Sequence, residues 1–316
     1  MRVIFMGTPA LAIPALELLA HEHEIVLVVT QPDKLAGRGH KLQASPVKEY
    51  SLERGWPLLQ PERARDQNFI AQLRATKPDA IVVVAYGQIL PLEILELPRE
   101  NFPHGGCVNL HFSLLPRWRG AAPVQYSIWK GDTVTGVSTQ WMAEKLDAGD
   151  IILQREVPIA SNETASELFE KLTPLGAEVL AETMRLMEKG EAPRNPQNEN
   201  LATFAPTIKK EEAQIHWSQS AEEIVNHIRA FNPRPSAQCE FRGETLKIWR
   251  ARLGASTLIQ HSTAKPGELL EVRERVLVAA REATVELLEL QPAGKSKMNA
   301  LDWARGARLQ TGEILN

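Results

Sequence analysis

The chain has 316 residues, of which 43% are apolar, and it carries 36 Lys and Arg against 39 Asp and Glu. This length and apolar content predict two domains, each with its own core. The balanced charge excludes the strongly basic composition typical of many nucleic-acid-binding proteins, and no apolar run reaches the roughly 20 residues that a membrane span needs.

Both the first residues and the cysteine content are typical of a cytoplasmic protein. The first residues, 1–7, are typical of a strand and not of a signal peptide, so we expect a cytoplasmic protein. Cys107 and Cys239 are far apart in the sequence, which disfavours a disulfide framework and a Cys-rich metal site. Both are expected to be buried thiols.

Apolar runs typical of strands alternate with helical patterns in the first half of the chain. Strands are expected at residues 3–7, 25–30, 79–85 and 106–111, and helices at 10–20, 46–54 and 67–76. This alternation predicts an α/β fold with a Rossmann-like, doubly wound and mostly parallel sheet. The first turn is Gly7-Thr8-Pro9 and not Gly-x-Gly-x-x-Gly, which disfavours a nicotinamide enzyme.

The second half of the chain changes character after residue 190. Strands are expected at 134–142 and 151–159, and Thr164-x-x-Glu167 is a capping box for a helix that ends near residue 190. A polar, Pro-containing stretch without periodicity follows and predicts a linker. Beyond it, Ser220-x-x-Glu223 caps a helix, and five short runs predict a small β-barrel, at 238–242, 245–252, 268–273, 276–280 and 284–290.

Asn109 and His111 form the most informative local pattern. They lie two residues apart in the strand expected at 106–111, so their side chains point the same way. Pro116 ends the strand and leaves this pair at its carboxyl end, where open α/β sheets bind ligands. Taken alone, a polar strand end that only caps a neighbouring loop is the commoner alternative.

The run Asn109-x-His111-x-Ser113-Leu114-Leu115-Pro116, joined to Asp147 in a later Leu-Asp-Ala-Gly-Asp run, resembles the folate-dependent formyltransferases. Further motifs extend the resemblance over nearly the whole chain, toward the members that act on initiator tRNA: Gly7-Thr8-Pro9, Thr30-Gln31-Pro32-Asp33, Ala36-Gly37-Arg38-Gly39, residues 115–123, 228–233 and 290–295. The resemblance implies a catalytic domain that binds 10-formyltetrahydrofolate over 1–190, a linker over 191–210, and an OB-like tRNA-binding domain over 211–316.

The activity that this resemblance implies is a formyl transfer. The formyl group of 10-formyltetrahydrofolate would pass to the α-amino group of methionyl initiator tRNA, which gives N-formylmethionyl-tRNA for translation initiation. Attack by the amine places negative charge on the formyl oxygen, and Asn109 and a protonated His111 can donate hydrogen bonds to it. By resemblance, Asp147 lies beside His111, favours its charged form and helps to move the proton to the departing folate nitrogen.

The same resemblance assigns binding residues. The folate pocket would be walled by Ser113, Leu114, Leu115 and Pro116, together with Tyr86, Gly87, Gln88, Ile89 and Leu90. Arg38 and Lys41 lie in a Gly-flanked loop over 34–41 that would reach the tRNA acceptor end, although such a loop is more often only solvated. Lys209 and Lys210 are candidates for phosphate contacts, which fix position without reading sequence.

Other interpretations of these residues carry less weight. No metal is assigned, because His21 with His23 and His104 with Cys107 lack further ligands at suitable spacing. The isolated Trp217, Trp249 and Trp303 are expected in the core and not against nucleotide bases. The chain departs from the family pattern at Phe112, Thr207 and Arg234. We expect a monomer, and two alternatives stay open: a formyltransferase for a small amine, and a tRNA-binding protein without catalysis.

Overall fold

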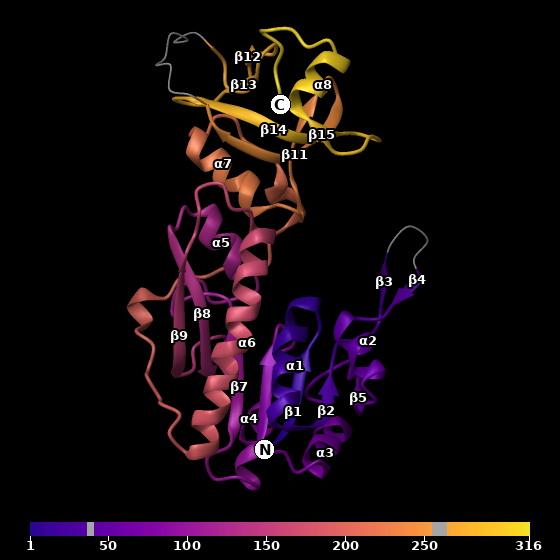
Figure 1. Cartoon of the computed structure of the whole chain (residues 1–316), viewed down its shortest axis with the longest axis vertical. Coiled ribbons are helices and arrows are strands. Elements are labelled where there is room, and N and C mark those ends of the chain that lie inside the picture. Colours follow the sequence, from indigo (N-terminus) through magenta and orange to yellow (C-terminus); the bar gives the residue numbers. More distant parts are fainter. Residues whose placement is uncertain (37–40, 255–263) are drawn as a thin grey trace. The chain divides into compact units, whose positions relative to one another are not determined.

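The computed structural model describes residues 1–36, 41–254 and 264–316, without the side chains of Leu35, Ala36 and Lys41 (Figure 1). The chain divides into two compact units that interleave along the sequence. The first comprises Met1–Pro123, Thr135–Val157 and Phe169–Ala205, and the second comprises Val124–Val134, Pro158–Leu168 and Pro206–Asn316. Segments from the first 168 residues therefore join the second unit, and the domain boundaries 1–190, 191–210 and 211–316 stay a prediction.

The first unit is built on a seven-stranded sheet with the order β5-β2-β1-β6-β7-β8-β9. Its strands are β1 Arg2–Gly7, β2 Glu24–Val29, β5 Leu58–Leu59, β6 Ala80–Val84, β7 Gly106–His111, β8 Val134–Trp141 and β9 Ile151–Pro158. Neighbours from β5 to β7 pair in parallel, and β8 runs antiparallel to β7. The predicted Rossmann-like, mostly parallel sheet is confirmed.

Helices lie between or after these strands in the sequence. They are η1 Ala10–Ala12, α1 Ile13–Glu22, α2 Pro46–Glu53, α3 Gln67–Ala75, α4 Leu92–Glu96, η2 Leu97–Glu100, α5 Pro123–Trp129 and α6 Ala165–Lys189. Local capping sets where helices begin: Ser45 accepts from the Lys48 backbone N–H, and Asp66 caps α3. One face of the core joins Ile4 and Met6 of β1 to residues of β6 and α3, because alternate strand residues face one side.

The second unit contains a six-stranded antiparallel sheet with the order β10-β11-β14-β13-β12, and β15 pairs with β14. Its elements are η4 Lys210–Ala213, α7 Ala221–Ala230, β10 Ala237–Phe241, β11 Glu244–Leu253, β12 Leu269–Glu271, β13 Val276–Ala279, β14 Thr284–Pro292, β15 Met298–Asn299 and α8 Ala300–Gly306. The β11 register shifts near Arg250, and such irregularities bend a strand. The predicted small barrel-type sheet is confirmed.

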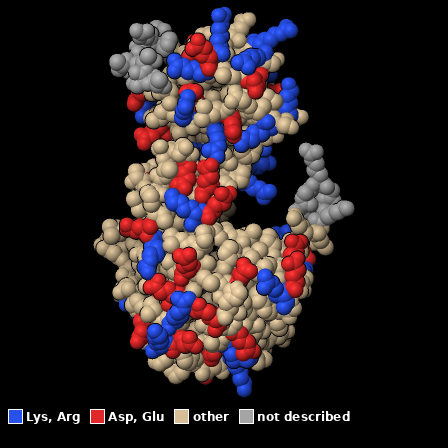
Figure 2. Space-filling model, viewed as in Figure 1, with Lys and Arg blue, Asp and Glu red and all other residues tan. Residues whose placement is uncertain are grey.

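A short hairpin follows β2 in the sequence, and acidic and basic side chains share the visible surface. The ends of the loop expected at 34–41 pair as a hairpin of β3 Lys34–Ala36 and β4 Lys41–Gln43. None of the described helices is long and apolar enough to cross a bilayer. Figure 2 shows acidic and basic side chains interspersed on the visible face, in keeping with the balanced composition.

Candidate active site

Strand β7 positions the amide and the imidazole that the sequence singles out. All six of its residues are buried, and it lies between β6 and β8. Asn109 and His111 are 8% and 6% exposed, and both fall at the carboxyl end of the strand. Because strand side chains alternate, the two project to the same side of the sheet.

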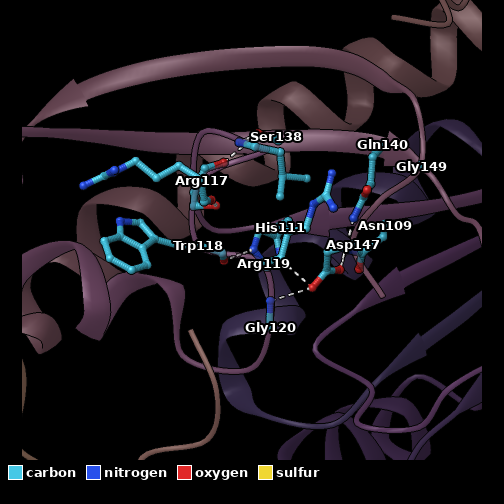
Figure 3. A network of polar contacts seen from close by, with 12 residues as sticks. Asn109, His111, Arg117, Trp118, Arg119, Gly120, Ser138, Gln140, Asp147 and Gly149 are labelled. Carbon is cyan, nitrogen blue, oxygen red and sulfur yellow. Dashed lines mark hydrogen bonds and ion pairs between the residues drawn. The ribbon is translucent and has the colours of Figure 1, made fainter. Parts of the chain in front are cut away.

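Asp147 meets this pair from the turn that follows β8. Its backbone has φ +49°, in the left-handed region, and its side chain is 11% exposed. Oδ2 accepts from the Gly120 backbone N–H at 2.9 Å and lies 3.7 Å from His111 Nδ1, whereas Oδ1 accepts from Gln140 Nε2 at 3.1 Å and from Asn109 Nδ2 at 3.4 Å (Figure 3). The structure thus brings the three predicted catalytic residues together.

The backbone of Trp118 fixes the tautomer of His111. His111 Nε2 lies 2.9 Å from the Trp118 carbonyl oxygen (Figure 3). A carbonyl can only accept, so Nε2 carries the hydrogen and donates it. The other ring nitrogen, Nδ1, faces Asp147.

Asn109, His111 and Asp147 line a cavity of about 440 Å³. The cavity is lined by Val83, Ala85, Tyr86, Gly87, Gln88, Ile89, Asn109, Leu110, His111, Phe112, Gly120, Ala121, Pro123, Met142, Leu146 and Asp147. The walls are mainly apolar, and Asn109, His111 and Asp147 are among their polar side chains. Four of the five predicted folate contacts from residues 86–90 line it, and Leu90 lines a smaller cavity next to it.

The other predicted folate contacts, residues 113–116, lie in the turn after β7 and are absent from the described lining of this cavity. Ser113 is fully buried and its hydroxyl donates to the Arg117 carbonyl at 2.6 Å. The Leu115 N–H donates to Ser138 Oγ at 3.0 Å. This turn therefore lies outside the described wall of the cavity, and its contact with folate stays a prediction.

The predicted tRNA contacts are only partly described. Arg38 lies outside the described residues, and for Lys41 the backbone alone is described. Lys209 and Lys210 are exposed in the second unit, where η4 begins. Their contact with tRNA stays a prediction.

The structure adds site groups that sequence reasoning missed. They are the Gly120 N–H, the Trp118 carbonyl and the amide of Gln140, which is paired directly opposite Asn109 in the β7–β8 register. Strand alternation could have identified Gln140, because it places that side chain beside the Asn109 side chain. The positions of the two backbone groups depend on loop conformation, which no residue pattern in the sequence predicts.

Neither of the two thiols is reactive, and the described residues contain no cluster of metal ligands. Burial raises the pKa of the Cys107 thiol, and it raises that of Cys239 to about 12, so both are inert at neutral pH. Both are buried and unbridged, as predicted. Among the residues described, no three His, Cys, Asp or Glu side chains come together as metal ligands.

Comparison with known proteins decides the family. The family described as "Formyl transferase" matches residues 1–184, and "Formyl transferase, C-terminal domain" matches residues 207–308. A methionyl-tRNA formyltransferase of Moorella thermoacetica is 46% identical over 317 residues, which cover all of this chain and 99% of that one. The chain belongs to the methionyl-tRNA formyltransferase family.

A second relative and a solved structure agree with this membership. The methionyl-tRNA formyltransferase of Clostridioides difficile is 43% identical over the full length of both chains. HypX from Aquifex aeolicus, solved in complex with tetrahydrofolic acid, is similar with a TM-score of 0.63 and 19% identity. The match covers 96% of this chain but about half of HypX, 47%, and supports the formyltransferase fold alone.

Proposed function

We propose that this chain transfers the formyl group of 10-formyltetrahydrofolate to the α-amino group of methionyl initiator tRNA, with Asn109, His111 and Asp147 as catalytic residues. The observation that carries the proposal is the convergence of these three side chains on the wall of one mainly apolar cavity. Full-length identity to methionyl-tRNA formyltransferases supports the same substrate pair.

The cavity fits a folate by its chemistry. Ile89 and Leu146 line it and are 72% and 59% exposed, so both leave apolar surface that a ligand could cover. A flat heteroaromatic ring laid against them would cover this surface and gain its burial free energy. Tyr86, Gly87 and Gln88 would form the other contacts with the ring. The formyl group would lie next to Asn109, His111 and Asp147.

Asn109 and His111 would stabilise charge on the formyl oxygen. When the amine attacks the formyl carbon, that oxygen becomes negative and needs donors already in place. Asn109 Nδ2 and His111 Nδ1 are 3.4 and 3.7 Å from the Asp147 carboxylate, both beyond the usual 2.7–3.2 Å for an N–H···O bond. Neither donor is firmly committed in the free protein, so both can turn to a substrate oxygen.

Asp147 would carry the proton. As the new C–N bond forms, the amine nitrogen must lose a proton, and the folate nitrogen must gain one as its C–N bond to the formyl carbon breaks. A carboxylate within reach of His111 can accept the first proton and pass it on, directly or through water. The Gly120 N–H and the Gln140 amide, which both donate to Asp147, fix the position of its carboxylate for this step.

The acceptor would be held through phosphate contacts. Residues 209–316 carry 16 Lys and Arg against 14 Asp and Glu, whereas residues 1–208 carry 20 against 25. This asymmetry supports tRNA binding by the cation-richer part, with Lys209 and Lys210 as candidates. Arg38 and Lys41 are separate candidates, in the loop over 34–41 of the first part. We also propose that the enzyme acts in the cytoplasm as a monomer.

The test is an acceptor panel. Purified protein is mixed with 10-formyltetrahydrofolate and with methionyl initiator tRNA, methionyl elongator tRNA, glycinamide ribonucleotide or an amino sugar nucleotide. Formylation confined to the initiator tRNA is the expected result. Formylation of a small amine instead would keep the site and overturn the acceptor, and no transfer to any acceptor would favour a tRNA-binding protein without catalysis.

A further inference from the structure

Gln197 lies after α6, in the segment that the sequence predicts as a linker, yet its amide contacts three parts of the active site. Nε2 donates to the carbonyl oxygens of Gly149 at 2.7 Å and Asp147 at 2.9 Å, and to Gln140 Oε1 at 3.2 Å. Oε1 accepts from Arg119 Nη2 at 2.8 Å and Nε at 3.1 Å. All of these residues belong to the first compact unit.

Arg119 dictates which way this amide points. Its side chain is fully buried and forms an ion pair with Glu199 at 2.7 Å. A guanidinium can only donate hydrogen bonds, so the Gln197 oxygen must face it. The Gln197 NH₂ group is thereby forced toward the turn at residues 147–149.

Gln197 in turn dictates the orientation of Gln140. Gln140 is 1% exposed, and its Oε1 faces the Gln197 donor, which leaves its NH₂ group to face Asp147 Oδ1 at 3.1 Å. Two hydrogens on Gln197 Nε2 serve three acceptors, so one of them is shared. The same amide thus secures the turn and selects the group that Gln140 presents to Asp147.

We propose that Gln197, held by Arg119, is a positioning residue for formyl transfer, a role that rests on the proposed function of Asp147. At φ +49° Asp147 adopts a conformation that few non-glycine residues take, so contacts must hold the turn. Gln197 supplies two of them at the backbone of the turn. Without it, the carboxylate loses its fixed distance to His111 and Asn109.

The variant Gln197→Glu separates this role from simple packing. It keeps the size of the side chain and the oxygen that accepts from Arg119, but it removes both hydrogens and sets a carboxylate against three oxygens. We expect kcat to fall about 10²-fold, because small displacements of catalytic groups cost that much. The Kd of a folate analogue and the KM for tRNA should change less than about threefold, since uniform binding is untouched.

Asn195→Asp is the matched control. It makes the same amide-to-carboxylate change two residues earlier in the same segment, where Nδ2 donates to the Ile151 carbonyl at 3.2 Å and to no other group among the residues that the structure describes. Its kcat should stay close to that of the wild type. Equal losses in both variants would show that added charge in the segment, and not the orientation of Gln197, causes the effect.

A double-mutant cycle decides the matter even where Gln197→Glu folds poorly. Gln197→Met and Gln140→Met each remove one amide at similar volume, and thermal melting reports whether each variant folds. If Gln197 acts partly through Gln140, the kcat losses combine to less than their product. Losses that multiply, or wild-type kcat in a folded Gln197→Glu, would overturn the proposal. Absence of transfer by the wild type would instead count against the proposed function.

Discussion

The two donors at the site, the Asn109 amide and the His111 imidazole, are held in place but make only long contacts with Asp147. Asn109 and His111 are both nearly buried, so water competes little for their N–H groups. In such a setting a hydrogen bond to a developing charge is stronger than it would be in water. The Trp118 carbonyl holds the far side of the imidazole and leaves its Nδ1 edge, next to Asp147, for chemistry.

Asn109→Ala tests the amide. Removal of one donor to a developing oxyanion typically lowers kcat about 10²–10³-fold, and folate-analogue binding should change little because the apolar walls remain. Steady-state kinetics and equilibrium binding measure the two quantities. Asn101→Ala, which removes an amide that donates to the Pro78 carbonyl outside the site, is the control. Wild-type kcat in Asn109→Ala would remove this residue from the mechanism.

At the level of elements, the loop over residues 118–122 depends on the segment that ends the first unit. The Arg119 N–H donates to the Thr203 carbonyl at 2.9 Å, and the Ala122 N–H donates to the Ala205 carbonyl at 3.0 Å. This loop supplies the Trp118 carbonyl and the Gly120 N–H to the site. The backbone after α6 therefore helps to hold these two groups of the candidate site from outside the sheet.

Gly120→Ala tests that support. Gly120 has φ +122°, and a Cβ there would lie 2.6 Å from the Ala205 carbonyl oxygen, so the two segments must separate. Gly55→Ala is the control, because Gly55 also has positive φ, +68°, but has nothing within 4 Å of a Cβ. The control should lose about 1–2 kcal/mol of unfolding free energy and keep kcat. Gly120→Ala should lose more stability and most of its kcat, and identical behaviour of the two variants would contradict the account.

Helix α7 introduces a pH dependence of stability. His227 is 3% exposed, its Nε2 lies 2.8 Å from the Glu212 carbonyl, and its ring packs on Trp129 and Phe231. Burial lowers the pKa of His227 to about 4. The unfolded chain, with the higher pKa near 6.5, takes up the proton first, so stability is full above pH 6.5 and falls as pH drops toward 4.

Denaturant unfolding from pH 7 to pH 4 measures this effect. The contribution is up to roughly 3 kcal/mol over that window, and His227→Gln should remove that part of the slope. His21→Gln, a change at an exposed residue, should leave the slope as it is. An unchanged slope in His227→Gln would show that other groups set the acid sensitivity.

The sequence predicts the elements of this fold better than their grouping. Apolar runs indicate β1, β6 and β7 because these strands are buried, and the helices expected at 46–54 and 67–76 correspond to α2 and α3. The short α8 and the two-residue β5 lack enough periodicity to be found. That 124–134 and 158–168 join the second unit depends on tertiary contacts, which one sequence does not display.

The sequence likewise predicts some residues of the candidate site and not others. Asn109, His111 and Asp147 follow from motif order, and strand alternation explains why the first two share a side. Gln197 gives no comparable signal, because it sits in a polar stretch without periodicity and becomes part of the site only through Arg119. Residues that act through other residues need the structure to be found.

At the scale of the whole molecule, net charge differs between the two parts of the sequence. Residues 1–208 have a net charge of −5 and residues 209–316 a net charge of +2. A polyanionic tRNA acceptor would be drawn to the latter. Binding of this kind weakens as the salt concentration rises, because the release of counterions from the phosphates then yields less free energy.

The variant Lys209→Gln/Lys210→Gln tests the tRNA contact. The KM for methionyl initiator tRNA should rise several-fold, and the slope of log KM against log salt should fall by up to about 2, roughly one per lost phosphate contact. Lys77→Gln, at an exposed cation of the first unit, is the control and should keep both values. A salt slope that is unchanged in the double variant would exclude phosphate contacts by these lysines.

The most direct measurement is a single turnover of Asp147→Asn with 10-formyltetrahydrofolate and methionyl initiator tRNA both bound. The substitution keeps the shape of the side chain and removes the charge that faces His111 and the oxygen that accepts a proton. The account predicts that both substrates still bind while formyl transfer falls at least about 10²-fold below the wild type. Transfer at the wild-type rate would contradict the assignment of catalysis to this site.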